Sequence, residues 1–253
     1  MDSTLEYETE MTGMKIFSGE RTILLSDRSL VSISESDTKV AFHSKKQLKK
    51  VFQEFIENER ATNLIIYAEP AYFTISLLSS FLSLFKIIEA AGGLVKNDKG
   101  ENLFIFRRGK WDLPKGKIIV RRHRSTDYPL WQTDDFFPEP TAEENKEQAK
   151  IKEPYDKAAI REVMEETGLH DIRIIRELPR TYHIYRQQGK WILKPTSWFE
   201  MYAPEDQALI PEEKEDITEV RWFNRDEMKI IKGNTYASIR ELLCNYFSSN
   251  LSA

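Results

Sequence analysis

The stretch Arg161-Glu162-Val163-Met164-Glu165-Glu166-Thr167-Gly168-Leu169 decides which fold we expect for the chain. On a helix, at about 100° per residue, Glu162, Glu165 and Glu166 fall on one face at the spacings i, i+3 and i+4. Like charges at these spacings destabilise a helix, so stability alone does not select them. Carboxylate oxygens that share a site with substrate phosphates and water are the usual ligands of Mg²⁺. The pattern therefore indicates either a metal-binding face or a solvated acidic face.

The other residues of this helix indicate which side is buried. Ile160, Val163 and Met164 fall opposite the glutamates, and we expect them to pack against the protein. Ala158 lies on the glutamate face one turn earlier, where its small side chain leaves room. Gly168 stands where a left-handed residue ends a helix. The helix should therefore present its carboxylates to a cleft.

The stretch resembles the second half of the Nudix hydrolase signature, G-x5-E-x7-R-E-U-x-E-E-x-G-U, in which U is a bulky apolar residue. Glu153, eight residues before Arg161, occupies the earlier glutamate position, but Glu147 stands where the opening glycine should be. The expected opening appears upstream, in Trp111-Asp112-Leu113-Pro114-Lys115-Gly116-Lys117. The signature is thus split: Gly116 is its first glycine, and an insertion of roughly thirty residues, far longer than ordinary connections, precedes Glu153.

The resemblance implies a reaction class. It is the Mg²⁺-dependent hydrolysis, with Mn²⁺ as the alternative cation, of a nucleoside diphosphate linked to another group or of a polyphosphate, by attack of water on phosphorus. The form Leu113-Pro114-Lys115-Gly116 is similar to dinucleoside polyphosphate and diphosphoinositol phosphate hydrolases, while nucleotide sugars and oxidised nucleotides remain open. The alternative is a non-catalytic Nudix-like ligand-sensing or regulatory protein, which needs no metal-binding glutamates.

The resemblance also implies roles for individual residues. The metal ligands are Glu162, Glu165 and Glu166, with a backbone carbonyl near Lys115–Gly116. Arg161 is expected to pair with Glu153 and hold the loop against the helix. These five side chains form the expected catalytic set, and the expected substrate-binding residues are Lys115, Gly116 and Arg107.

Two features of the site stay open. The general base is either a glutamate of the signature or one of Glu212, Glu213 and Glu215. Ile119 stands where an acidic residue often follows the first glycine by three positions, so the metal-binding set is expected to be smaller than in some relatives.

Composition limits the class of protein further. The chain has 253 residues, 40% of them hydrophobic and 31% charged, enough for one large domain or two small ones. Its formal net charge of −4 argues against general nucleic-acid binding. We expect a phosphorylated small molecule as partner, neither nucleic acid nor membrane, and leave a homodimer open.

Cysteine usage favours a reducing compartment. Cys244 is the only cysteine, so no intrachain disulfide forms, and an acidic start without signal-peptide features also fits a cytoplasmic protein. Because Cys244 lies beside Leu242, Leu243 and Phe247, we expect it to be a buried small hydrophobe.

The fold expected is an α/β/α Nudix sandwich that carries a small N-terminal α/β domain. Residues 1–12 form a flexible tail, 13–88 the small domain, and 89–253 the Nudix domain, with its insertion at about 118–152. In the small domain we expect a helix capped by Ser44 and strands at Lys15–Phe17, Thr22–Leu25, Lys39–Phe42 and Asn63–Ala68. Ala71–Phe85 is uncharged but too short to span a membrane, and we expect it to be a helix buried between the domains.

In the larger domain, a hairpin of Ala90–Val95 and Leu103–Arg108 is expected first. Later strands are expected at Ile172–Leu178, Thr181–Arg186, Trp191–Tyr202 and Val220–Phe223, with a turn at Gln188-Gly189 and helices that begin at Asp226 and Thr235. His43 and His183 are each single histidines without an evident partner, and we interpret both as structural.

The insertion begins with a basic run and continues with aromatic residues. Arg121, Arg122 and Arg124 lie close in sequence to the presumed phosphate site. Tyr128, Trp131, Phe136 and Phe137 follow, then a helix from Thr141 to Ile151. A segment of this kind is a lid that contacts substrate, a packing or self-association surface, or a disordered excursion.

Overall fold

The computed structural model describes residues 13–27, 37–58, 63–122 and 150–249 of the chain. The strands are β1 (Gly13–Ser18), β2 (Arg21–Ser26), β3 (Thr38–Ala41), β4 (Asn63–Tyr67), β5 (Lys86–Ile87), β6 (Ala90–Lys96), β7 (Asn102–Arg107), β8 (Lys110–Asp112), β9 (Lys115–Lys117), β10 (Val120–Arg122), β11 (Lys150–Lys152), β12 (Arg173–Gln187), β13 (Lys190–Tyr202) and β14 (Ile217–Phe223). The helices are α1 (Lys45–Glu57), α2 (Pro70–Tyr72), a π-helix (Phe73–Leu78), α3 (Ser79–Leu82), α4 (Tyr155–Thr167), a 3₁₀ turn (Glu213–Glu215), α5 (Met228–Gly233) and α6 (Ala237–Ser249).

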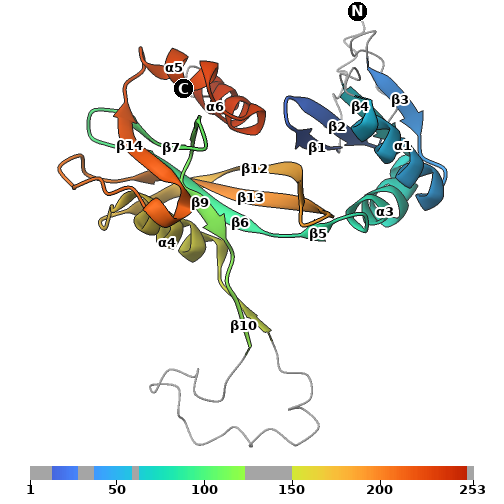
Figure 1. Cartoon of the computed structure of the whole chain (residues 1–253), viewed down its shortest axis with the longest axis horizontal. Helices are drawn as coiled ribbons and strands as arrows, with labels where there is room; N and C mark the ends of the chain where they lie inside the picture. The colour runs from blue at the N-terminus through green and yellow to red at the C-terminus, as the bar shows by residue number, and fades with distance from the viewer. Residues whose placement is uncertain (1–12, 28–36, 59–62, 123–149, 250–253) are drawn as a thin grey trace, which may run out of the picture.

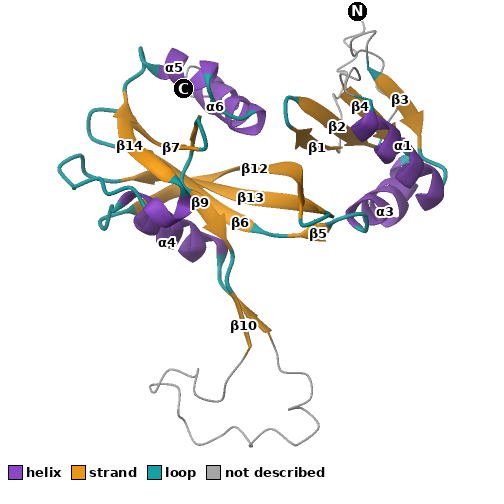
Figure 2. Ribbon diagram, in the orientation of Figure 1, coloured by secondary structure: helices purple, strands orange, loops and turns teal. Residues whose placement is uncertain are grey.

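A single mixed sheet runs through the molecule, in the order β14-β7-β6-β13-β12-β1-β2-β4-β3 (Figure 2). The N-terminal strands join it where β1 pairs in parallel with β12, at Ile16↔Tyr182 and Phe17↔His183. The chain is therefore an α/β protein built on one continuous sheet. The division into domains at residue 88 stays a prediction.

Alternating side chains along β13 give the sheet a different cover on each face. Trp198 is buried with α6, whereas its neighbour Phe199 is buried with α4, because successive side chains of a strand point to opposite faces. Leu193 lies on the same side as Phe199 and packs against the helices of the N-terminal part. α6 thus covers one face of the sheet and α4 the other, as in Figure 1.

The N-terminal elements follow the sequence pattern closely. α1 begins after Ser44, whose hydroxyl oxygen accepts a hydrogen bond from the amide of Gln47 at 3.2 Å. The uncharged stretch forms α2, the π-helix and α3, and it buries Phe81 fully. It leaves Ile75 79% and Tyr72 62% exposed. The expected burial between the domains holds only for one face of this segment, because the other face lies outside the core. No helix in the described ranges has the length and apolar character needed to cross a bilayer.

The expected hairpin of β6 and β7 forms only at its turn. The two strands share the single pair Lys96↔Asn102 and then diverge. β6 pairs instead with β13 in parallel and with β9 in antiparallel register, at Gly92↔Lys115 and Ala91↔Gly116. This exchange of partners brings the start of the split signature beside α4.

The C-terminal half differs from expectation in its details. β12 is one long strand with an irregularity between Leu178 and Thr181, where two separate strands were expected. Cys244 is exposed on α6, and the expectation of burial was wrong because the apolar stripe of that helix passes beside it. The turn at Gln188-Gly189 is confirmed, with φ of 48° and 76°.

The insertion leaves the sheet as an antiparallel ribbon of β10 and β11. Lys150–Lys152 is a strand, so the expected helix does not reach Ile151. Arg124, the four aromatic residues and the rest of that expected helix lie outside the described residues.

Replacement of Gly168 by alanine should destabilise the fold. Gly168 has φ of 80°, and a Cβ there would lie 2.8 Å from the Cβ of Ile210. We expect Gly168→Ala to lower the free energy of unfolding by about 1–3 kcal/mol. In Gly233→Ala the new methyl group meets no described atom within 4 Å, and the change should stay within about 0.5 kcal/mol. Urea denaturation measures both, and equal changes in the two variants would contradict the account.

Candidate functional site

Helix α4 positions the carboxylates. It is held to the sheet by Ala158, Ala159 and Val163, all fully buried, and it ends where the left-handed Gly168 donates its amide to the carbonyl of Met164 at 3.0 Å. Met164 is 37% exposed, so its expected burial was wrong: it lies at the border of the buried stripe. The opposite border of the helix carries the signature glutamates.

Arg161 binds several acceptors at once. Its Nε and Nη2 each donate to one oxygen of Glu153, both at 2.8 Å, which is a bidentate fork. Nη1 donates to Glu162 at 2.7 Å and to Glu165 at 2.9 Å, and Nη2 also donates to the carbonyl of Lys117 at 3.1 Å. The carboxylates of Glu153 and Glu162 raise the pKa of Arg161. The expected pairing with Glu153 is present, and its part in catalysis stays a prediction.

The two ends of the insertion meet at Glu153. A carboxylate oxygen of Glu153 accepts from the amide of Ile119 at 3.1 Å, and the amide of Glu153 donates to the carbonyl of Ile119 at 2.9 Å. The chain therefore leaves after Gly116 and returns to the same place. This closure brings the two halves of the split signature together in space.

Gly116 lies directly against Glu162. A Cβ at residue 116 would stand 1.8 Å from a carboxylate oxygen of Glu162, so only glycine leaves room for this approach. Burial raises the pKa of Glu162, Arg161 opposes that shift, and the nearby charges of Glu165 and Glu215 raise it further. Carboxylates from α4 and from the 3₁₀ turn therefore repel one another around Gly116.

Glu166 is the most deeply buried carboxylate of the site. Its side chain is 3% exposed, and it accepts from Arg107 Nη1 at 3.1 Å and from the backbone amide of Lys115 at 2.8 Å. Burial raises the pKa of Glu166 to about 7, although Lys115 and Arg107 oppose the rise. Loss of water is thus the dominant influence on this group.

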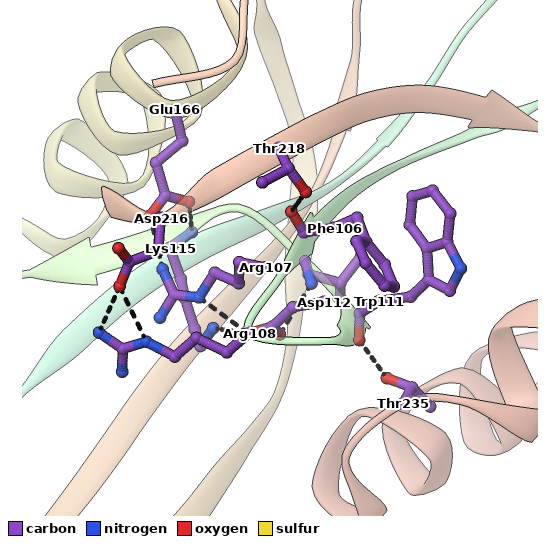
Figure 3. A network of polar contacts seen from close by, with 11 residues as sticks. Phe106, Arg107, Arg108, Trp111, Asp112, Lys115, Glu166, Asp216, Thr218 and Thr235 are labelled. Carbon is purple, nitrogen blue, oxygen red and sulfur yellow. Dashed lines mark hydrogen bonds and ion pairs between the residues drawn. The ribbon is translucent and has the colours of Figure 1, made fainter. Parts of the chain in front are cut away.

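Asp112 completes a buried ionic network with these cations (Figure 3). It forms an ion pair with Lys115 Nζ, accepts from the amide of Leu113 at 2.9 Å, and lies 3.7 Å from Arg107 Nε. Lys115 and Arg107 were expected to bind substrate, and in the structure they form ion pairs with Asp112 and Glu166. Asp112 itself was missed, because its place before Leu113-Pro114 reads as an ordinary strand end.

The glutamates are not gathered around one point. Among the described residues, no three histidine, cysteine or acidic groups lie close enough to hold a metal ion as they stand. Glu162 and Glu165 turn to Arg161, and Glu166 turns to Arg107. The donor set still fits a hard cation, because several carboxylates share one helix face and burial raises the pKa values of two of them.

Comparison with known proteins identifies the larger part of the chain. A model of the NUDIX domain matches residues 86–245, and no curated protein matches. Among solved structures, a MutT protein from Methanosarcina mazei Go1 is 20% identical, covers 66% of this chain and 96% of its own, and has a TM-score of 0.41. An Ap4A hydrolase binary complex from C. elegans is 20% identical and covers 65% of this chain and 98% of its own, with a TM-score of 0.39. A NUDIX hydrolase from Nitrosomonas europaea is 18% identical, covers 65% and 90%, and has a TM-score of 0.39.

Replacement of Arg161 by lysine should loosen the site. A lysine keeps the charge but cannot bind Glu153 through two parallel hydrogen bonds while it also reaches the carbonyl of Lys117. We expect Arg161→Lys to lower the free energy of unfolding by about 1–3 kcal/mol. In the control Arg108→Lys, whose ion pair with Asp216 joins side chains 65% and 62% exposed, the change should stay below about 1 kcal/mol. If both variants unfold at the same urea concentration as the wild type, the bidentate contact of Arg161 with Glu153 does not stabilise the fold.

Proposed function

The chain belongs to the Nudix hydrolase family, whose members are pyrophosphohydrolases, and from that premise we propose that it cleaves a diphosphate linkage in a phosphorylated small molecule by attack of water on phosphorus. One observation carries the proposal. Glu162 packs directly against Gly116 and accepts a hydrogen bond from Arg161, and Glu166, one turn further along α4, is buried. A solvated acidic helix face would have none of this burial.

Glu162, Glu165 and Glu166 would hold the divalent cation, Mg²⁺ or Mn²⁺. When bound, such a cation stabilises negative charge on phosphoryl oxygens and lowers the pKa of a coordinated water. Arg161 positions two of these carboxylates, and the amide of Lys115 fixes the third. The intact set speaks against a ligand-sensing protein without catalysis.

Lys115 and Arg107 are the proposed phosphate-binding cations. Lys115 is buried and Arg107 is half-buried, and each is paired with a carboxylate, so neither side chain has to be ordered when substrate arrives. Asp112 links the two, and it limits the net positive charge of the site when no substrate is bound. A substrate phosphate would compete with Asp112 for Lys115 Nζ, which binds anions as a point charge.

Glu215 is our choice of general base among the alternatives. Its charge contributes to the raised pKa values of both Glu162 and Arg107, so it lies near the carboxylates and the phosphate-binding cations. Glu212 instead accepts from the amide of Lys214 at 3.2 Å and caps the 3₁₀ turn. Glu213 is exposed on the same turn. The exposed carboxylate of Glu215 is free to accept a proton from water as it attacks.

For the substrate, we propose a class rather than a compound. The form Leu113-Pro114-Lys115-Gly116 resembles hydrolases of dinucleoside polyphosphates and diphosphoinositol phosphates, and the two cations Lys115 and Arg107 suit a substrate with several phosphates. The exposed, unpaired thiol of Cys244 suits a reducing compartment, which supports the proposal of a cytoplasmic enzyme.

Two glutamine variants test the carboxylate roles. Glu165→Gln removes a proposed metal ligand at a side chain that is 56% exposed, so the fold should persist while kcat falls at least about 100-fold. Glu215→Gln should lower kcat by a similar factor. Glu213→Gln, the matched control on the same 3₁₀ turn, should keep wild-type turnover. Steady-state release of phosphate products measures all three, and wild-type kcat in Glu165→Gln would show that this residue is not a ligand.

A further inference from the structure

Two strands outside the signature carry ionisable side chains on the sheet face that α6 covers. Lys194 of β13 lies on the same side of the strand as Trp198, which is buried with α6. His183 of β12 is the direct cross-strand partner of Lys194. Both side chains are partly exposed, so a ligand can reach them.

Lys194 has no counter-charge of its own. Within the ranges that the structure describes, its ammonium makes no ion pair and no hydrogen bond. Burial and the positive charges of Lys115 and Arg107 together lower the pKa of Lys194 to about 8, although Asp112 and Glu166 oppose the shift. Burial and the charge of Lys194 also lower the pKa of His183 to about 3, so the imidazole is neutral at physiological pH. A neutral imidazole still donates one N–H to an anion.

The carboxylates that act on Lys194 are bound to other cations. Asp112 and Glu166 favour its charged form, but their ion pairs are with Arg107 and Lys115. A desolvated ammonium without a partner is unfavourable, so stability does not explain a lysine at this position.

A second orphaned polar group lies beside Lys194. Thr196, two residues along β13 and therefore on the same face, is 1% exposed, and its hydroxyl has no hydrogen-bond partner among the described residues. Its cross-strand neighbour Thr181 accepts from Trp198 Nε1 at 2.8 Å. Buried hydroxyls are nearly always satisfied, so this one marks a place where a partner is missing.

Strand β9 connects this region to the carboxylates. Gly116 faces Glu162 on the side of α4, and the preceding residue, Lys115, points its side chain the other way, toward Asp112. Lys115 thus influences Glu166 on one side and Lys194 on the other. The two groups of charges lie on either side of a single short strand.

We propose that Lys194, with His183 beside it, binds a phosphate group of the substrate that lies beyond the diphosphate to be cleaved. The inference rests on the proposed function for its substrate, but the anion site itself does not depend on turnover. It assigns to the enzyme a preference for substrates with more phosphates than the reaction requires.

Binding of inorganic tripolyphosphate, with all divalent cations chelated, tests the anion site alone. We expect Lys194→Met to weaken the dissociation constant, measured by titration calorimetry, by roughly tenfold. Lys190→Met removes an exposed lysine from the same strand and should bind as the wild type does. Equal affinity of wild type and Lys194→Met would overturn the inference.

Stability separates a binding role from a structural one. Because Lys194→Met removes a half-buried charge that has no ion pair among the described residues and keeps the apolar stem, its melting temperature without ligand should equal or exceed that of the wild type. Tripolyphosphate should raise the melting temperature of the wild type and not that of the variant. A lower melting temperature of Lys194→Met would indicate a structural partner for the lysine and contradict the proposal.

Kinetics then connect the site to substrate. For a dinucleoside tetraphosphate, Lys194→Met should raise KM roughly tenfold with little change in kcat, and for a dinucleoside diphosphate it should change neither. An equal effect on both substrates would remove the assignment to a distal phosphate. If the wild type hydrolyses neither substrate but binds tripolyphosphate through Lys194, the proposed function fails while the anion site stands.

Discussion

The guanidinium group of Arg161 is the contact on which the site depends. It binds Glu153 at the return of the insertion, the carbonyl of Lys117 at its departure, and Glu162 and Glu165 on its own helix. Both ends of the insertion are thereby bound to α4 through one side chain. A planar donor fork fixes all these acceptors at once. The insertion between Gly116 and Glu153 is therefore compatible with close contact between the two halves of the signature.

Burial of charge is the second constraint, because removing these groups from water opposes folding. Burial raises the pKa values of Glu162 and Glu166 and lowers that of Lys194, so burial disfavours the charged form of all three groups. Such groups concentrate where function needs them.

Local features were predictable from the sequence, and long-range ones were not. The left-handed end of α4 at Gly168 and the cap at Ser44 depend on neighbouring residues alone, and both were correctly placed. The exchange of strand partners by β6 and the junction of β1 with β12 depend on contacts between distant segments. The place of Lys194 beside Lys115 follows from those contacts and had no sequence signal. Cys244 was expected to be buried and is exposed, because helical periodicity does not determine the burial of a residue at the edge of an apolar stripe.

The central claim is that the carboxylate face of α4 supports metal-dependent hydrolysis at phosphorus. Reaction of the full chain with a dinucleoside tetraphosphate in ¹⁸O-labelled water, with Mg²⁺ and again with a chelator, tests it directly by mass spectrometry of the products. The account predicts cleavage only with the metal, and one labelled oxygen on a phosphorus of a product. Cleavage that persists undiminished in the chelator, or products whose phosphates carry no label, would contradict it.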